Sequence, residues 1–340
     1  MRIRLDAGNA SVAIEAGLLV EPTGRCDLTI EVPQGELRPG LINAHDHLHR
    51  NGYGRLGRPP YANAYEWGRD IHARDAAAIA RGRAVARLDA LRVGAWKNLL
   101  SGVTTVVHHD PWEPAFESGF PIAVPRIRSA HSLGFDATIT GQGRPLAIHV
   151  AEGTDPRSAR EVHDLADRRW LTPDLLAVHV VGPDEAGIDL LRRSGAAVVW
   201  CPTSNLFLFG RTAPRELLAP GIDVLLGSDS LLTADGTLLD ELRAARRLEL
   251  VSDERLLDAV GAVAAARLGL AAPSLAPGAP ANVIVLKKPI FEATADDVTV
   301  VVAAGKLRVL DPALVAAIGP RAENGRRYET GRSWRWIDDT

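Results

Sequence analysis

The stretch Leu146-Ala147-Ile148-His149 is an apolar burst that ends in a histidine, and Leu176-Ala177-Val178-His179 repeats the pattern further along the chain. Similar bursts lie at residues 196–200 and 222–226, and helical patterns separate them. Short apolar runs rich in β-branched residues are typical of parallel strands that are buried on both faces. The alternation of such strands with helices predicts an α/β fold with a parallel sheet.

The helices between these strands carry recognisable ends. Asp155 can cap a helix that has Pro156 at its first position, and a further helix is expected from Ser252 to Gly269. From Leu146 onward the strands recur about every 25 residues, a spacing that fits a (β/α)8, or TIM-type, barrel. We expect this barrel to span residues 41–272.

Both ends of the chain read instead as short strands. Residues 27–32 alternate between apolar and polar, and residues 282–286 and 298–302 are β-branched runs with turn residues between them. We therefore expect residues 1–40 and 273–340 to join in a small, discontinuous β-sandwich domain.

The stretch between residues 111 and 145 is too short for a regular barrel. Two strands and three crossovers should fit there, whereas one βαβ crossover alone takes at least about 10–12 residues. Strand three is expected at Phe120–Val124 and strand four at Asp136–Ile139. We therefore predict a barrel that is incomplete around strands 3–4, with a flank that a neighbouring subunit of a homo-oligomer or the C-terminal tail covers.

The composition is that of a globular protein and excludes several classes. Of 340 residues, 46% are hydrophobic and 24% are charged, which excludes a disordered, collagen-like or coiled-coil protein. The formal net charge of −3 gives no basic surface for nucleic acid or an anionic membrane. Two cysteines are too few for a disulfide framework, and no apolar run approaches the roughly 20 residues of a membrane span. We expect a cytoplasmic protein whose partner is a small-molecule substrate.

Side chains that can bind metals close several of the predicted strands. His45 and His47 are two residues apart, so on a strand both face the same side. His149, His179 and Asp229 each follow an apolar strand. The catalytic residues of a barrel come from the carboxyl ends of several strands, and histidine is the commonest metal ligand. The pattern therefore predicts a metal site at the mouth of the barrel.

The motifs around these residues resemble those of the amidohydrolase superfamily, and more narrowly its branch of cytosine deaminases, chlorohydrolases and S-adenosylhomocysteine deaminases. The matching stretches follow one another along nearly the whole chain: Pro39–His47, Gly102–Val107, His149–Glu152, His179–Gly182, Cys201–Asn205, Gly227–Asp229 and Pro277–Val283. Asn282 stands where the family usually has aspartate.

The resemblance implies a mononuclear metal site. The implied ligands are four side chains at strand ends: His45, His47, His149 and Asp229. The implied catalytic residues are Glu152 as the proton shuttle, His179, which polarises or orients the attacked group, and Asp229 beside the attacking water. The resemblance leaves the metal open between zinc, which we expect, and iron.

The lysine content supports a single metal ion. Binuclear relatives bridge two metals with a carboxylated lysine on a middle strand. This chain has no lysine between Lys97 and Lys287, so no middle strand can supply such a bridge.

The predicted activity is that of an aminohydrolase, or deaminase, which attacks an sp² carbon of a small nitrogen heterocycle with metal-activated water and releases ammonia. A cyclic amide or ureide hydrolase with the same metal site is the alternative, and a catalytically inactive binding relative is a third possibility. Released ammonia, against a ring-opened acid, separates the first two. Stoichiometric metal with metal-dependent turnover excludes the third.

Substrate contacts are expected at the barrel mouth. Trp67 lies in a loop rich in glycine and proline after strand one, a common place for a substrate lid. Histidines and aromatic rings can hydrogen-bond to and stack on a planar heterocycle. The further candidates of these types are His108, His109, Trp112 and Phe207.

Overall fold

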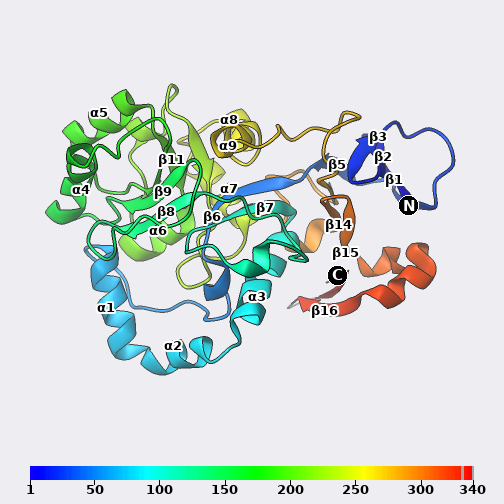
Figure 1. Ribbon diagram of the computed structural model, residues 1–340, viewed down its shortest axis with the longest axis horizontal. Helices are drawn as coiled ribbons and strands as arrows, with labels where there is room; N and C mark the ends of the chain where they lie inside the picture. The colour runs from blue at the N-terminus through cyan, green and yellow to red at the C-terminus, as the bar shows by residue number, and fades with distance from the viewer. Residues whose placement is uncertain (331–332, 339–340) are drawn as a thin grey trace.

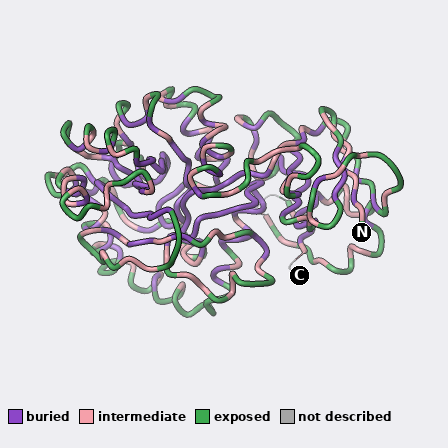
Figure 2. The backbone as a smooth tube through the Cα atoms, turned by 45° about the horizontal axis from the view of Figure 1, so that its top comes forward, coloured by how far each residue is buried: buried purple, intermediate pink, exposed green. Residues whose placement is uncertain are grey.

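The computed structural model describes residues 1–330 and 333–338, and within them seven parallel strands form the centre of the larger part of the molecule (Figure 1). Five of these strands make one sheet in the order β12-β11-β10-β9-β8, while β6 pairs with β7. Their bounds are β6 Leu41–Asp46, β7 Val103–His108, β8 Arg128–Ser132, β9 Leu146–Val150, β10 Leu175–His179, β11 Ala197–Trp200 and β12 Val224–Leu226. All of these strands except β8 consist entirely of buried residues, which is the expected property of parallel strands covered on both faces (Figure 2).

A backbone hydrogen bond links the five-stranded sheet to the β6–β7 pair. Just past β12, the backbone N–H of Asp229 donates to the carbonyl of His45 in β6 at 3.0 Å. Next to β7, where a third strand was expected, Thr105 forms a single parallel bridge with Ala123. The parallel α/β architecture is thus confirmed, and the strand predicted at Phe120–Val124 is reduced to this one bridge.

The prediction of strand four at Asp136–Ile139 is wrong. The strand that precedes β9 is β8, which pairs with β9 in parallel, and Asp136 forms an isolated bridge with Ser132 instead. The strand β8 has the sequence Arg-Ser-Ala-His-Ser and therefore lacks the apolar run by which the other central strands are recognised.

Nine α-helices lie within the described residues. Their bounds are α1 Ala64–Arg74, α2 Ala76–Arg83, α3 Arg87–Leu99, α4 Pro156–Asp167, α5 Glu185–Ser194, α6 Pro202–Phe209, α7 Leu238–Arg247, α8 Asp253–Ala259 and α9 Ala262–Leu268. Asp155 caps α4 by accepting the backbone N–H of Ser158, as predicted. The helix expected from Ser252 to Gly269 is broken at Gly261, whose backbone is not helical, into α8 and α9. None of the described helices is long and apolar enough to cross a membrane.

The outer layer of helices has a gap after β7 and β8, although α3 packs against β7. Residues 100–155, all of which the structure describes, contain one short 3-10 helix and no α-helix. This confirms the predicted shortage of covering helices between residues 111 and 145. The 3-10 helices of the chain are η1 Leu48–Arg50, η2 Pro114–Phe116, η3 Arg215–Leu217, η4 Ala295–Asp297 and η5 Pro312–Asn324.

Strands from both ends of the chain lie together at the right of Figure 1. One sheet has the order β3-β2-β1-β4 and the other the order β16-β17-β15-β14-β13-β5. Their bounds are β1 Arg2–Ala7, β2 Ser11–Glu15, β3 Leu18–Val20, β4 Leu28–Val32, β5 Glu36–Pro39, β13 Val283–Leu286, β14 Val298–Ala303, β15 Lys306–Leu310, β16 Arg326–Thr330 and β17 Ser333–Ile337. Apolar side chains of the two sheets share one core cluster. We propose that these sheets form the discontinuous domain that the sequence predicts.

Candidate active site

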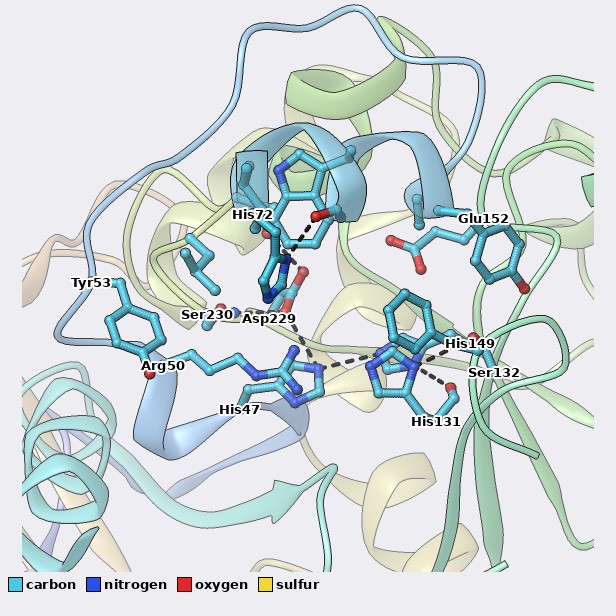
Figure 3. Close-up of a pocket in the computed structure, with 18 of the residues that line it drawn as sticks. His47, Arg50, Tyr53, His72, His131, Ser132, His149, Glu152, Asp229 and Ser230 are labelled. Atoms are coloured by element: carbon cyan, nitrogen blue, oxygen red, sulfur yellow. Dashed lines mark hydrogen bonds and ion pairs between the residues drawn. The ribbon is translucent and has the colours of Figure 1, made fainter. Parts of the chain in front are cut away.

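Four side chains from three strand ends converge at the mouth of the parallel sheet. His45 and His47 come from the end of β6, His149 from β9, and Asp229 from the residues after β12. The ligand-type nitrogens of the three histidines lie within 4.8 Å of one another. One carboxylate oxygen of Asp229, Oδ1, lies 3.7 Å from Nε2 of His45 and 4.0 Å from Nε2 of His47. The tertiary structure therefore gathers the four predicted ligands at one point, and Figure 3 shows three of them, His47, His149 and Asp229.

The hydrogen bonds of two of these histidines fix which nitrogen faces the centre. Nδ1 of His47 lies 2.6 Å from the Asp110 carboxylate, and Nδ1 of His149 lies 2.5 Å from the carbonyl of His131. Nδ1 of His149 must donate to this carbonyl, so Nε2 of its neutral ring is unprotonated, and Nδ1 of His47 donates to the Asp110 carboxylate. Nε2 of His47 faces Nε2 of His149 at 3.3 Å. Two ring nitrogens at this separation can share one cation, either a proton or a metal ion.

His45 completes this arrangement. Its side chain is fully buried, and neither ring nitrogen has a hydrogen-bond partner. A buried polar atom without a partner costs free energy, unless a group absent from the protein satisfies it. Burial, together with the neighbouring histidines, lowers the pKa of His45 and of His149 well below the ordinary value, so both rings are neutral. Neutral imidazole is the form that binds metals.

Asp229 supplies the negative charge of the site. Its Oδ2 accepts hydrogen bonds from the hydroxyls of Ser204 and Thr233, both at 2.8 Å, while Oδ1 is turned toward the histidines. Burial alone raises the pKa of this carboxyl, but His179, His47 and the two hydroxyls outweigh it, so the pKa lies below its usual value. Three histidines and one carboxylate are a donor set that fits a divalent metal such as zinc or iron.

Glu152 and His179 lie next to the four predicted ligands. Oε1 of Glu152 lies 3.6 Å from Nε2 of His179, and Nδ1 of His179 contacts the side-chain amide of Asn205 at 2.9 Å. Burial, together with Asp229 and Glu161, raises the pKa of Glu152 well above its ordinary value, which favours the protonated acid. A protonated carboxylic acid next to a group of candidate metal ligands can transfer its proton to a bound molecule.

The loop that carries Glu152 is fixed by the segment that leads into α1. The backbone N–H of Ala64 donates to the carbonyl of Glu152 at 3.0 Å, and the N–H of Thr154 donates to the carbonyl of Ala62 at 2.8 Å. The chain at Ala151 has a positive φ of 50°, so it turns sharply after β9. This turn brings Glu152 back toward the four predicted ligands, whereas an extended strand would carry it away from them.

A cavity of about 370 Å³ opens above these residues. The polar side chains that line its floor include His47, His149, Glu152, His179 and Asp229, and its upper walls come from α1, α2 and the residues after β8 (Figure 3). Trp67, a predicted substrate contact, lines this cavity.

The other four predicted substrate contacts do not line it. His108 and Trp112 border a separate, much smaller cavity, and His109 is buried behind His149 with Nε2 2.9 Å from the carbonyl of Ala130. Phe207 lies on α6 beneath the guanidinium of Arg55. These four residues lie outside the lining of the main cavity, and their contact with a substrate stays a prediction.

Sequence reasoning missed several lining residues. His131, Ser132 and Phe135 belong to β8 or follow it, and they were overlooked because that strand lacks an apolar run. A histidine followed by a serine, His131-Ser132, was the available signal. Asp110 follows β7, and its bond to His47 joins residues 63 positions apart and leaves no local trace.

A second group of metal-type residues lies beside the first. His49, His108 and Asp110 bring ligand atoms within 4.8 Å of one another. However, the backbone N–H of Leu48 donates to Nδ1 of His108 at 3.3 Å, so the proton of the neutral ring is on Nε2. Arg50 also holds Asp110 with an ion pair at 3.2 Å. A protonated Nε2 and an adjacent guanidinium do not fit a second metal ion.

Comparison with known proteins agrees with this geometry. Residues 142–308 match the Amidohydrolase family. A 5'-deoxyadenosine deaminase of Methanosarcina mazei is 28% identical over 200 residues, 50% of this chain and 46% of that protein. A 5-methylthioadenosine/S-adenosylhomocysteine deaminase of Teredinibacter turnerae is 37% identical over 141 residues, 37% of this chain and 31% of that protein. The matched stretches thus span less than half of these curated relatives.

Solved structures show the same fold. An adenosine deaminase from Xanthomonas campestris with bound zinc superposes with a TM-score of 0.68 at 17% identity, over 94% of this chain and 97% of that chain. A zinc-containing atrazine chlorohydrolase from Arthrobacter aurescens gives a TM-score of 0.66 at 18% identity, over 90% and 94%. The family match over residues 142–308 and the shared fold agree that this chain is similar to the amidohydrolases.

Proposed function

We propose that this protein is a metal-dependent aminohydrolase that attacks an sp² carbon–nitrogen centre of a small nitrogen heterocycle and releases ammonia. The observation that carries the proposal is geometric: Nε2 of His47 and Nε2 of His149 face each other at 3.3 Å beside the buried, unpartnered ring of His45, with Glu152 next to His179. The family match and the deaminase names of the curated relatives support the same reaction class.

The proposed cofactor is a single zinc ion, with iron as the alternative, held by His45, His47, His149 and Asp229. When bound, such an ion supplies Lewis-acid chemistry that lowers the pKa of water toward about 7. Asp229 Oδ1, which is turned toward the histidines, takes up a proton from the attacking water. Its other oxygen stays occupied by the hydroxyls of Ser204 and Thr233, so the carboxylate cannot turn away.

Glu152 and His179 act on the substrate in this proposal. Glu152 begins the reaction protonated and donates that proton to a ring nitrogen beside the attacked carbon. It then takes up the hydroxyl proton of the adduct and passes it to the leaving nitrogen, and the proton that Asp229 took from the water restores Glu152. His179 Nε2 faces the same space as Glu152 and stabilises the charge that develops during attack. Its ring stays in place because Asn205 contacts the opposite nitrogen.

The cavity walls favour a neutral, partly apolar substrate. Opposite the polar floor, the walls carry the side chains of Trp67, Ile71, Ile79 and Leu232. A volume of about 370 Å³ is in the range of pockets for small molecules. We propose that the heterocycle binds above His179 and Glu152 with an apolar substituent against these walls.

The cyclic amide or ureide hydrolase remains the alternative because it needs the same donor set, and its product would be a ring-opened acid. The homo-oligomer and the cytoplasmic location also remain proposals. The helix-poor flank at residues 100–155 is where another subunit would pack, and sedimentation velocity of the purified protein tests this assembly.

The test is metal analysis of the purified protein combined with an ammonia-release screen over purines, pyrimidines, triazines and guanidino compounds. Glu152→Gln is expected to keep its zinc and to lose about 10²–10⁴-fold in turnover, the usual contribution of a general acid. A fully active Glu152→Gln variant would overturn the proton-shuttle role. Ring-opened products without ammonia would favour the alternative hydrolase.

A further inference from the structure

Lys97 is a buried lysine in a chain that uses arginine almost everywhere else. Of 39 lysines and arginines, four are lysines. Lys97 lies on α3, and its side chain is 7% exposed. Its ammonium contacts three acceptors: Asp46 Oδ2 at 3.0 Å, Ser228 Oγ at 3.0 Å and the backbone carbonyl of Asp229 at 2.9 Å. Three N–H donors thus meet three acceptors, a geometry that a compact ammonium satisfies and a planar guanidinium does not.

Asp46 lies between the predicted ligands His45 and His47, and its side chain is fully buried. Besides Lys97, its carboxylate accepts hydrogen bonds from the amides of Asn51 and Asn98, both at 2.8 Å. An ionised carboxylate at this depth requires a counter-charge. The ammonium therefore joins the end of β6 to the end of β12 beneath the site.

The backbone of Asp229 is in a conformation that costs free energy. Its φ is 49°, in the left-handed region that non-glycine residues seldom adopt. Both polar backbone groups of the residue are held: the N–H donates to the His45 carbonyl at 3.0 Å, and the carbonyl accepts from Lys97. Such a conformation persists where surrounding contacts enforce it.

We propose that Lys97 is a positioning residue that holds the Asp229 backbone in this conformation and so directs Oδ1 toward His45 and His47. The proposal rests on the proposed metal site, because its expected consequence is a change in metal affinity. It does not depend on the identity of the substrate. Gly94 lets α3 come close enough for this contact, because a Cβ there would lie 2.3 Å from the carbonyl of Leu48.

The simpler role for Lys97 is to balance the charge of Asp46. A double variant, Lys97→Met with Asp46→Asn, separates the two roles. It removes both charges of the Lys97–Asp46 pair, so neither is left unbalanced, but it still lacks the bond to the Asp229 carbonyl. The measurements are zinc affinity by chelator competition and the melting temperature of the metal-free protein. Lys288→Met is the matched control, since that lysine is half exposed and pairs with Asp297.

Lys97→Met is expected to lower the melting temperature and to weaken zinc binding by about 10–100-fold, as loss of other groups that orient metal ligands does. Lys97→Arg should keep the charge and still bind zinc weakly. The double variant should regain melting temperature without regaining zinc affinity. If Lys97→Met does not fold, the double variant carries the test.

Zinc affinity of the double variant within threefold of the wild type would overturn the proposal and leave Lys97 as a charge partner. Wild-type affinity in Lys97→Met would do the same. An absence of deaminase activity in the wild type would count against the proposed function, but it would leave the zinc-affinity result unaffected.

Discussion

Two clusters of histidine and aspartate lie side by side at the mouth of the sheet, and they differ in which nitrogen carries the proton. In the first cluster, Nδ1 of His47 and Nδ1 of His149 donate to oxygen acceptors, so the Nε2 atom of each ring faces the centre. In the second cluster, Nδ1 of His108 accepts the backbone N–H of Leu48, so Nε2 is protonated. The same residue types therefore make a candidate metal site in one place and a hydrogen-bonded structural group in the other.

Asp110 takes part in both clusters. It accepts the Nδ1 proton of His47 at 2.6 Å, lies 3.6 Å from Nδ1 of His49, and pairs with Arg50. Burial raises the pKa of Asp110, but His47 and Arg50 lower it by more, so the pKa lies well below its ordinary value. The carboxylate therefore stays ionised and orients His47 while the guanidinium of Arg50 keeps a cation out of the second cluster.

The largest effect should come from breaking the first cluster itself. His149→Ala removes one of the two facing Nε2 atoms, so zinc affinity is expected to fall by more than the about 10–100-fold that loss of an orienting partner causes. Ammonia release should fall to background. His163→Ala is the control, because this histidine lies outside both clusters and pairs with Asp184. Retained zinc in His149→Ala would show that the cluster does not hold the metal.

Asp110→Asn tests the link between the clusters. The amide can still accept a hydrogen bond from His47, but it loses the charge that favours the Nδ1–H form of that ring. We expect zinc affinity to fall about 10–100-fold. Isothermal titration with zinc measures the change, with the exposed Asp167→Asn as the control. A loss of less than threefold would mean that the Asp110 charge does not orient His47.

The second cluster should reveal itself by the pH dependence of stability. Burial lowers the pKa of His108 to about 3, whereas in the unfolded chain the ring titrates near 6.5. The unfolded state therefore binds a proton that the folded state refuses, and the wild type loses stability as the pH falls from about 6.5 toward 3. His108→Asn removes this proton uptake on unfolding. As the pH falls through that window, the stability of the variant relative to the wild type should therefore rise by at most about 1.4 kcal/mol per pH unit. Denaturant unfolding at pH 7.5, 6.0 and 5.0 measures it, and a pH-independent difference would contradict the assignment.

The smallest effect is expected for metal binding in the same variant. His108→Asn should bind one equivalent of zinc with an affinity within threefold of the wild type, because the second cluster does not fit a cation. Competition with a chelator, together with metal analysis, measures both the affinity and the stoichiometry. A second equivalent of zinc in the wild type that His108→Asn loses would reverse the contrast between the clusters.

Prediction from the sequence succeeded where the signal was local. His149 and His179 end apolar strands, and the structure has β9 and β10 in those places. It failed at β8, whose polar sequence gives no strand pattern, and consequently His131 was missed as a lining residue. Of the expected substrate contacts, His108, His109, Trp112 and Phe207 do not line the main cavity, because the direction of a side chain at a strand end depends on neighbours far away in the chain.

The sequence by itself determined the order of strands and helices, the positions of the ligand-type residues at strand ends, and the absence of a lysine from the middle strands. These follow from hydrophobic periodicity, turn residues and composition, which operate over a few neighbouring residues. The tertiary structure decided which nitrogen of each histidine faces the centre and which acceptors meet Lys97. Those contacts join residues 63 positions apart, as in His47 and Asp110, or 131 apart, as in Lys97 and Ser228, and a hydrogen bond between distant segments exists only once the strands that carry them are packed together.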